Sequence, residues 1–81
     1  LSPNDPALAS TYSNIGSVYK KQGNLAAALE HFQRALRIDL QASEPDQMQI
    51  AGHYNNIGLV LKLSDKGDEA LKNYEVALEI K

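Results

Sequence analysis

Cysteine is absent from this chain of 81 residues, so neither a disulfide nor a thiolate metal site can form. Two histidines without any cysteine do not supply the ligand set of a structural zinc site, and we expect no metal and no cofactor. No apolar run approaches the ~18 residues that a membrane-spanning helix needs. No signal or transit segment is visible either, so we expect a chain that works in the cytoplasm and away from membranes.

Positive charge is in slight deficit, with eight lysines and arginines against ten acidic residues. The net charge of -2 and the pI near 5.5 argue against a nucleic-acid partner, because nucleic-acid-binding surfaces are usually basic. The sequence has no paired nucleophile and base, no glycine-rich phosphate loop and no paired carboxylates at catalytic spacing, so we do not expect an enzyme. The hydrophobic fraction of 43% is typical of a folded domain.

Two segments of the chain each occur twice with the same displacement. The segment YSNIGSVY at residues 12–19 returns as YNNIGLVL at residues 54–61, which is 42 residues later. The segment ALEHFQRALRI at residues 28–38 returns as ALKNYEVALEI at residues 70–80, with the same displacement. The sequence is therefore organised as two copies of one unit.

The two copies account for nearly the whole chain. Aligned at the offset of 42 residues, positions 3–39 and 45–81 share 13 identities in 37 pairs, far more than chance would give. We expect one small module over residues 1–81, with a first repeat at about 5–42 and a second at about 46–81.

Helical periodicity runs through both copies. In the first segment the apolar side chains recur at i, i+4, i+7 and i+11, at Leu8, Tyr12, Ile15 and Tyr19. This spacing predicts one buried stripe on a helix, and polar residues occupy the opposite stripe at the same spacing, at Ser10, Asn14, Ser17 and Lys21. The fold class is therefore all-α, and the predicted helices lie near residues 6–21, 25–41, 47–63 and 66–80.

Close packing is expected within each pair of helices. Gly16 lies beside the buried stripe and costs the helix roughly 1 kcal/mol relative to alanine, so we expect a neighbouring helix to approach it closely. The small side chain of Ala28, next to bulky Phe32, is predicted to face Gly16 and to permit this approach. Two helices joined by so short a turn must lie antiparallel and pack on each other.

Capping residues mark the predicted helix starts. Asp5 is suited to cap the first helix because Pro6 fits the first helical position, and Asn4 is the alternative cap. Asn24 and Asp46 are expected to cap the second and third helices.

The turn inside the second copy departs from the first. Gly23 can take the left-handed conformation after the first helix, whereas Asp65 stands at the matching position and Gly67 comes two residues later. We expect Asp65 to cap the fourth helix, with Asp68 and Glu69 in its first turn offsetting the helix dipole.

At these residues the chain resembles the tetratricopeptide repeat family, whose motif has an aromatic, Leu-Gly, Tyr, Ala, Phe and Ala at fixed spacings. The first copy carries the pattern at Tyr12, Ile15, Gly16, Tyr19, Ala28, Phe32 and Ala35. The second copy carries it at Tyr54, Ile57, Gly58, Leu61, Ala70, Tyr74 and Ala77. The usual repeat has ~34 residues, and this longer form, with Asn-Asn-Ile-Gly in its first helix, resembles the kinesin light chain type.

The resemblance implies a right-handed α-solenoid whose first helices line a concave groove for a peptide or a partner's helix. The groove positions that it implies in the first copy are Ser10, Ser13, Asn14, Ser17, Lys20 and Lys21. Those in the second copy are Gly52, Asn55, Asn56, Leu59, Lys62 and Leu63. Asn14 and Asn56 are the best candidates, because a carboxamide can pair with both the N–H and the C=O of an extended backbone. The alternative is that these residues form ordinary solvated faces.

The lysines and histidines of the chain do not by themselves indicate a function. Lys20, Lys21 and Lys62 lie near helix C-termini, where their charge offsets the dipole. His31 and His53 lie off the predicted buried stripes, so we expect both on the surface.

Two functions fit these residues: a scaffold that binds a protein or peptide, and a structural element that associates with itself. In the second case the open ends of the repeat pair with other copies, because the fourth helix would present an apolar face at Leu71, Tyr74, Leu78 or Ile80.

Overall fold

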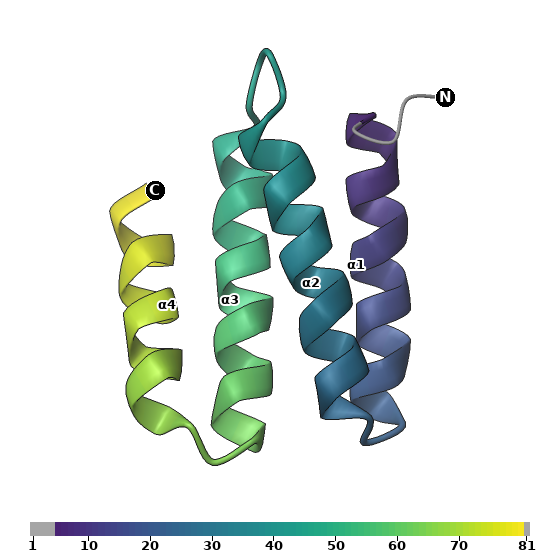
Figure 1. The fold of residues 1–81 in the computed structure, drawn as a ribbon. Coiled ribbons are helices and arrows are strands. Elements are labelled where there is room, and N and C mark those ends of the chain that lie inside the picture. The colour runs from purple at the N-terminus through teal and green to yellow at the C-terminus, as the bar shows by residue number, and fades with distance from the viewer. Residues whose placement is uncertain (1–4, 81) are drawn as a thin grey trace.

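Four α-helices form two antiparallel hairpins in the computed structural model, which describes residues 5–80 (Figure 1). The helices are α1 (Pro6–Lys21), α2 (Leu25–Leu40), α3 (Gln47–Leu63) and α4 (Gly67–Ile80). Each boundary lies within one residue of its predicted position, and the described range contains no strand, which confirms the all-α prediction. None of the helices in this range combines the length and apolarity that crossing a bilayer requires.

Side-chain caps begin the first three helices as the sequence predicted. The carboxylate of Asp5 accepts a hydrogen bond from the backbone N–H of Ala7 at 2.9 Å, and the alternative cap, Asn4, lies outside the described residues. Asn24 accepts from the N–H of Ala27 at 3.3 Å at the start of α2. Asp46 caps α3 by accepting from two N–H groups, at 3.0 and 3.3 Å. These polar side chains satisfy amides that the helices leave unpaired.

The two hairpin turns have the same backbone despite their different sequences. Gly23 has a φ of 81° and Asp65 has a φ of 64°, so both take the left-handed conformation. Asp is one of the few residues other than glycine that tolerate it. Lys66 then stands at the cap of α4, because its carbonyl accepts from the N–H of Ala70 at 3.0 Å. The prediction that Asp65 caps α4 was therefore wrong: it replaces Gly23 in the turn.

Each hairpin is closed by an aromatic ring lying on a glycine. A Cβ atom added to Gly16 would lie 3.0 Å from the ring of Phe32, and one added to Gly58 would lie 2.8 Å from the ring of Tyr74. The predicted close approach at Gly16 is confirmed. The three atoms nearest to the added Cβ all belong to the ring of Phe32, and Ala28 is itself fully buried.

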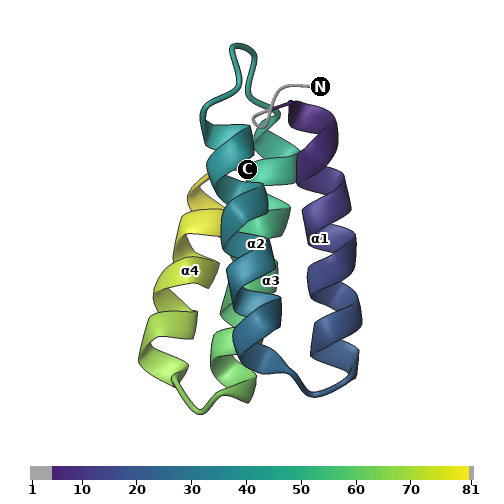
Figure 2. The same ribbon diagram turned by 45° about the vertical axis from the view of Figure 1, so that its right-hand side comes forward.

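The two hairpins stack so that α2 and α3 lie between α1 and α4 (Figure 1). Turned by 45°, the molecule shows α2 in front of α3, with α1 and α4 on either side (Figure 2). The main core joins the hairpins through buried side chains at Ala28, Phe32, Ile57, Val60, Leu61 and Ala70. Partly buried residues complete the core from α2 and α4, among them Leu29, Leu36 and Tyr74.

Burial differs between equivalent positions of the two copies. Ile57 of α3 is 4% exposed, whereas its equivalent Ile15 of α1 is 38% exposed. The predicted buried stripe is therefore closed on α3 but partly open on α1. The reason is that α3 has α2 and α4 on its flanks, whereas among the described residues only α2 packs extensively on α1.

Two alanine substitutions on α3 are expected to have opposite effects on stability. Gly58→Ala should gain about 1 kcal/mol of helix propensity but lose about 1–3 kcal/mol by overpacking against Tyr74, so we expect a net loss. Gly52→Ala should stabilise the chain by up to about 1 kcal/mol, because nothing lies within 4 Å of the added Cβ. Urea denaturation followed by circular dichroism checks both. Equal shifts of the two midpoints would contradict the close contact at Gly58.

Candidate ligand groove

A shallow polar hollow of about 200 Å³ lies between α1 and α3. It is lined by three residues of α1 and four residues of α3: Ser10, Ser13, Asn14, Gln49, Gly52, His53 and Asn56. These helices are the first of each hairpin, and the repeat places the same helical stripe of both against the same opening. The hollow therefore follows from the 42-residue repeat and from the stacking of the hairpins.

Five of the predicted ligand-groove residues line this hollow together. Ser10, Ser13 and Asn14 contribute from α1, and Gly52 and Asn56 contribute from α3. The two asparagines, 42 residues apart in the sequence, thus lie on one depression of the surface. The position of Gly52 between them leaves open space where any other residue would place a Cβ.

Four further predicted residues extend the two stripes beyond the hollow. Ser17 and Lys21 follow Asn14 by three and seven residues on α1, and Leu59 and Leu63 follow Asn56 in the same way on α3. Residues at these spacings share one face of a helix. Leu63 is 55% exposed and Leu59 is partly buried, so the face leads from a polar hollow to an apolar end on α3.

Asn55 and Lys62 lie on a different side of α3. Lys62 lines a separate depression with Leu71 and Tyr74 of α4, and Asn55 precedes Lys62 by seven residues on the same side. Asn55 corresponds to Ser13 of α1, which points toward α3. The matching side of α3 faces away from α1, so these two residues are not brought to the hollow.

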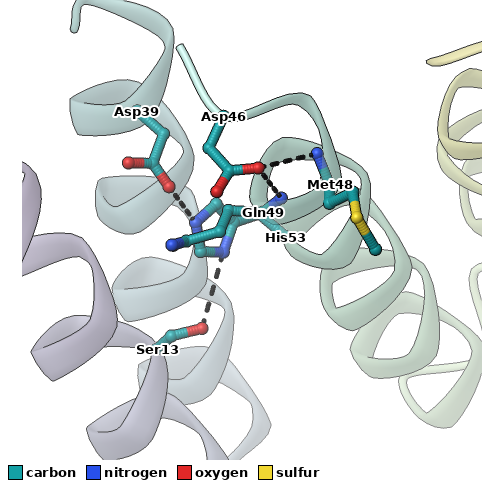
Figure 3. A network of polar contacts seen from close by, with 6 residues as sticks. All are labelled: Ser13, Asp39, Asp46, Met48, Gln49 and His53. Carbon is teal, nitrogen blue, oxygen red and sulfur yellow. Dashed lines mark hydrogen bonds and ion pairs between the residues drawn. The ribbon is translucent and has the colours of Figure 1, made fainter. Parts of the chain in front are cut away.

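His53 is buried, which contradicts its predicted place on the surface. The residue is 4% exposed and bridges three helices (Figure 3). Its Nε2 lies 2.5 Å from a carboxylate oxygen of Asp39 on α2, and its Nδ1 lies 3.5 Å from the hydroxyl of Ser13 on α1. Because a carboxylate accepts hydrogen bonds, Nε2 carries the donated proton and Nδ1 is left to accept from Ser13. The imidazole thus links the floor of the hollow to the core.

Asp39 and Gln49 are the other residues of this region that the sequence analysis missed. Asp39 is 4% exposed. It continues a stripe of buried residues on α2 at helical spacing, after Ala28, Phe32 and Ala35. An acidic residue on an apolar stripe was the available signal, since such a group needs a buried partner. Gln49 precedes His53 by four residues, so it lies on the same face of α3.

His31 is also less exposed than the sequence predicted. It is partly buried on α2, where its ring lies 5.2 Å from that of Tyr19 and 6.0 Å from that of Tyr12. Its Nδ1 donates to the carbonyl of Ala27 at 2.8 Å. The ring therefore fills the space between two tyrosines of α1 and has a structural role in the first hairpin.

The hollow offers hydroxyl and carboxamide groups together with one imidazole, and its lining contains no Lys, Arg, Asp or Glu side chain. Within residues 5–80 no three His, Cys, Asp or Glu side chains gather as a metal site would require. Hydroxyls and carboxamides both donate and accept hydrogen bonds, so they match uncharged polar groups such as peptide backbone. The chemistry of this surface is recognition by hydrogen bonds.

A comparison with protein families gives a match over nearly the whole chain. The model of a family described as tetratricopeptide repeat matches residues 4–81. This range contains all four helices and both copies of the sequence repeat.

Proposed function

The chain belongs to the tetratricopeptide repeat family, and from this premise we propose that it binds a peptide segment or a partner's helix along α1 and α3. Repeats of this family generally mediate protein–protein interaction, and they form a scaffold without catalysis of its own. The proposed site is the hollow together with the stripes that continue it, at Ser10, Ser13, Asn14, Ser17, Lys21, Asn56, Leu59 and Leu63.

The convergence of Asn14 and Asn56 on one hollow carries this proposal. Neither asparagine has a hydrogen bond to another described side chain, whereas Ser13 and His53 are linked to each other. Their carboxamides are available to pair with the backbone of an extended segment. Leu59 and Leu63 give the same face an apolar end on which side chains of that segment rest.

We also propose that the repeat is of the long, kinesin light chain type. The distance from Tyr12 to Ala28 is 16 residues, which is the usual spacing in the family, so the hairpin is not stretched. The extra length lies between Ala35 and Tyr54. There α2 continues to Leu40 and the connection runs to the cap of α3 at Asp46.

Removing both carboxamides is expected to weaken binding. Peptides that bind the wild-type chain can be selected from a displayed random library. Their affinity for the double variant that carries both Asn14→Ala and Asn56→Ala should be roughly five- to a hundred-fold weaker, because each net hydrogen bond contributes about 0.5–1.5 kcal/mol. Gln33→Ala is the matched control, since Gln33 is exposed on α2 outside the hollow. Unchanged affinity of the double variant, with its helix content intact, would place the binding site elsewhere.

A second function, association of the chain with itself, is favoured by the exposure of α4. Leu71 is 57% exposed and Leu78 is 71% exposed, whereas their equivalents Leu29 and Leu36 pack against the core. Large exposed apolar side chains on one face commonly mark an interaction surface. The apolar face of α4 is therefore a second candidate site, distinct from the groove.

A further inference from the structure

We propose that a second copy of this chain stacks head to tail on the first, with its α1 against α4 in the arrangement that α3 has against α2. This inference rests on the second proposed function and specifies its geometry. It uses an interface that the molecule already contains, because α2 and α3 join the two hairpins inside one chain. The surface that α2 contributes to this interface recurs on α4, and the surface that α3 contributes recurs on α1. No described residue covers either recurrence.

One half of the interface recurs on α4. Inside the chain, Leu29 and Leu36 of α2 pack against the core cluster that includes Ile57 and Val60 of α3. The repeat places Leu71 and Leu78 at the equivalent positions of α4, and these are 57% and 71% exposed. The side chains are identical, and only the covering helix differs.

The other half of the interface recurs on α1. Ile57 and Val60 are 4% and 0% exposed where α3 meets α2. Their equivalents, Ile15 and Val18, are 38% and 53% exposed on α1. Ile15 and Val18 repeat the residue types of the internal interface, so α1 offers the apolar stripe that the exposed leucines of α4 would cover.

The two free halves lie at opposite ends of the molecule, on α1 and on α4 (Figure 1). Contacts between two different surfaces of identical chains do not close on themselves after one step, so they build open stacks or rings and not twofold dimers. The internal interface also has the buried pair of His53 and Asp39, whereas α1 has exposed Thr11 in place of His53. The contact between copies therefore lacks that polar link, and we expect it to be reversible.

Stacking of this kind would also repeat the polar hollow. Asn55 corresponds to Ser13, and it lies on the side of α3 that faces away from α1 of the same chain. In the stack this side meets the α1 of the next copy, whose Ser10 and Asn14 correspond to Gly52 and Asn56. Asn55 would then line a second hollow, formed between α3 of one copy and α1 of the next. The groove would therefore continue from one copy to the next.

Two variants that each block one end test the geometry. Val18→Lys places a charge on the α1 face, and Leu78→Lys places one on the α4 face. Both positions are more than half exposed, so the fold should persist, which circular dichroism verifies. By sedimentation equilibrium, the wild-type mass should rise beyond that of a dimer with concentration, whereas each variant alone should stay monomeric. An equimolar mixture of the two should form a dimer and nothing larger, because one free α1 face meets one free α4 face.

Ser43→Lys is the matched control, because Ser43 is exposed in the connection between α2 and α3 and lies on neither α1 nor α4; it should associate as the wild type does. Leu71→Lys is a second variant of the α4 face and should behave like Leu78→Lys. Dimers of either end variant alone would show twofold pairing of like faces, which overturns the head-to-tail geometry but keeps self-association. A mixture that stays monomeric also overturns the geometry. A wild type that is monomeric at millimolar concentration overturns both, and it leaves peptide binding in the groove unaffected.

Discussion

Phe32→Ala is expected to lower the free energy of unfolding by about 3–5 kcal/mol, the usual cost of emptying a buried phenylalanine site. Phe32 is fully buried, and its ring lies against Gly16 of α1 while it also belongs to the core shared with α3. The substitution therefore opens a cavity at the point where the first hairpin closes and the second hairpin stacks. Small domains have a total stability of about 5–15 kcal/mol, so much of the native state should be lost.

Tyr74→Ala provides the internal comparison, because Tyr74 is the equivalent residue and its ring lies on Gly58 in the same way. Tyr74 is partly exposed at the edge of the molecule, so less apolar surface is returned to water, and we expect a clearly smaller loss. Urea unfolding followed by the helical circular dichroism signal measures both variants. Equal losses would show that the core shared between the hairpins contributes no more than the packing within each one.

The elements that could be predicted from the sequence are those set by neighbours in the chain. Asp5, Asn24 and Asp46 cap helices through amides two or three residues away, so the residue type and its position sufficed. The helix boundaries follow from these caps and from the turns. The misassigned role of Asp65 has the same local origin, because aspartate suits both a cap and a left-handed turn and the sequence alone does not choose.

Burial could be predicted less well, because it depends on which helices end up inside the stack. The sequence gives Ile15 and Ile57 the same place in the repeat, yet their exposures are 38% and 4%. His53 was expected on the surface because it lies off the stripe shared with α1. It becomes buried because α3 packs against α2 on a second side that α1 does not have.

The candidate site was predicted in part for the same reason. Asn14 and Asn56 share a hollow because a stripe facing away from the core within each hairpin stays open when the hairpins stack. Asn55 and Lys62 were assigned to the groove by their position in the repeat. Their side of α3 faces away from α1, and Lys62 lines a separate depression with residues of α4. A residue at this position contacts a neighbouring helix only where the first helix of another hairpin packs beside it. For α1 that helix is α3, whereas the described residues contain no such helix beyond α3.

His53→Leu is expected to cost about 3–5 kcal/mol of stability, because it leaves the buried carboxylate of Asp39 without its hydrogen-bond donor. Asp39 is the penultimate residue of α2, and the end of a helix adds negative partial charge around its carboxylate. The imidazole of His53 is the donor that satisfies this carboxylate at 2.5 Å. Among the described residues no buried side-chain nitrogen or oxygen lacks a hydrogen-bond partner, so the variant creates the first one.

Replacing both partners should be less damaging than replacing His53 alone. Asp39→Leu leaves an imidazole without its acceptor, which costs about 1–3 kcal/mol. The double variant removes both polar groups and puts apolar side chains together, so it should recover stability relative to His53→Leu. The four unfolding free energies, measured by urea denaturation, form a cycle whose coupling term reports the pair. Additive losses would mean that His53 and Asp39 are buried independently, and the link from the groove floor at Ser13 to the end of α2 would then have no energetic basis.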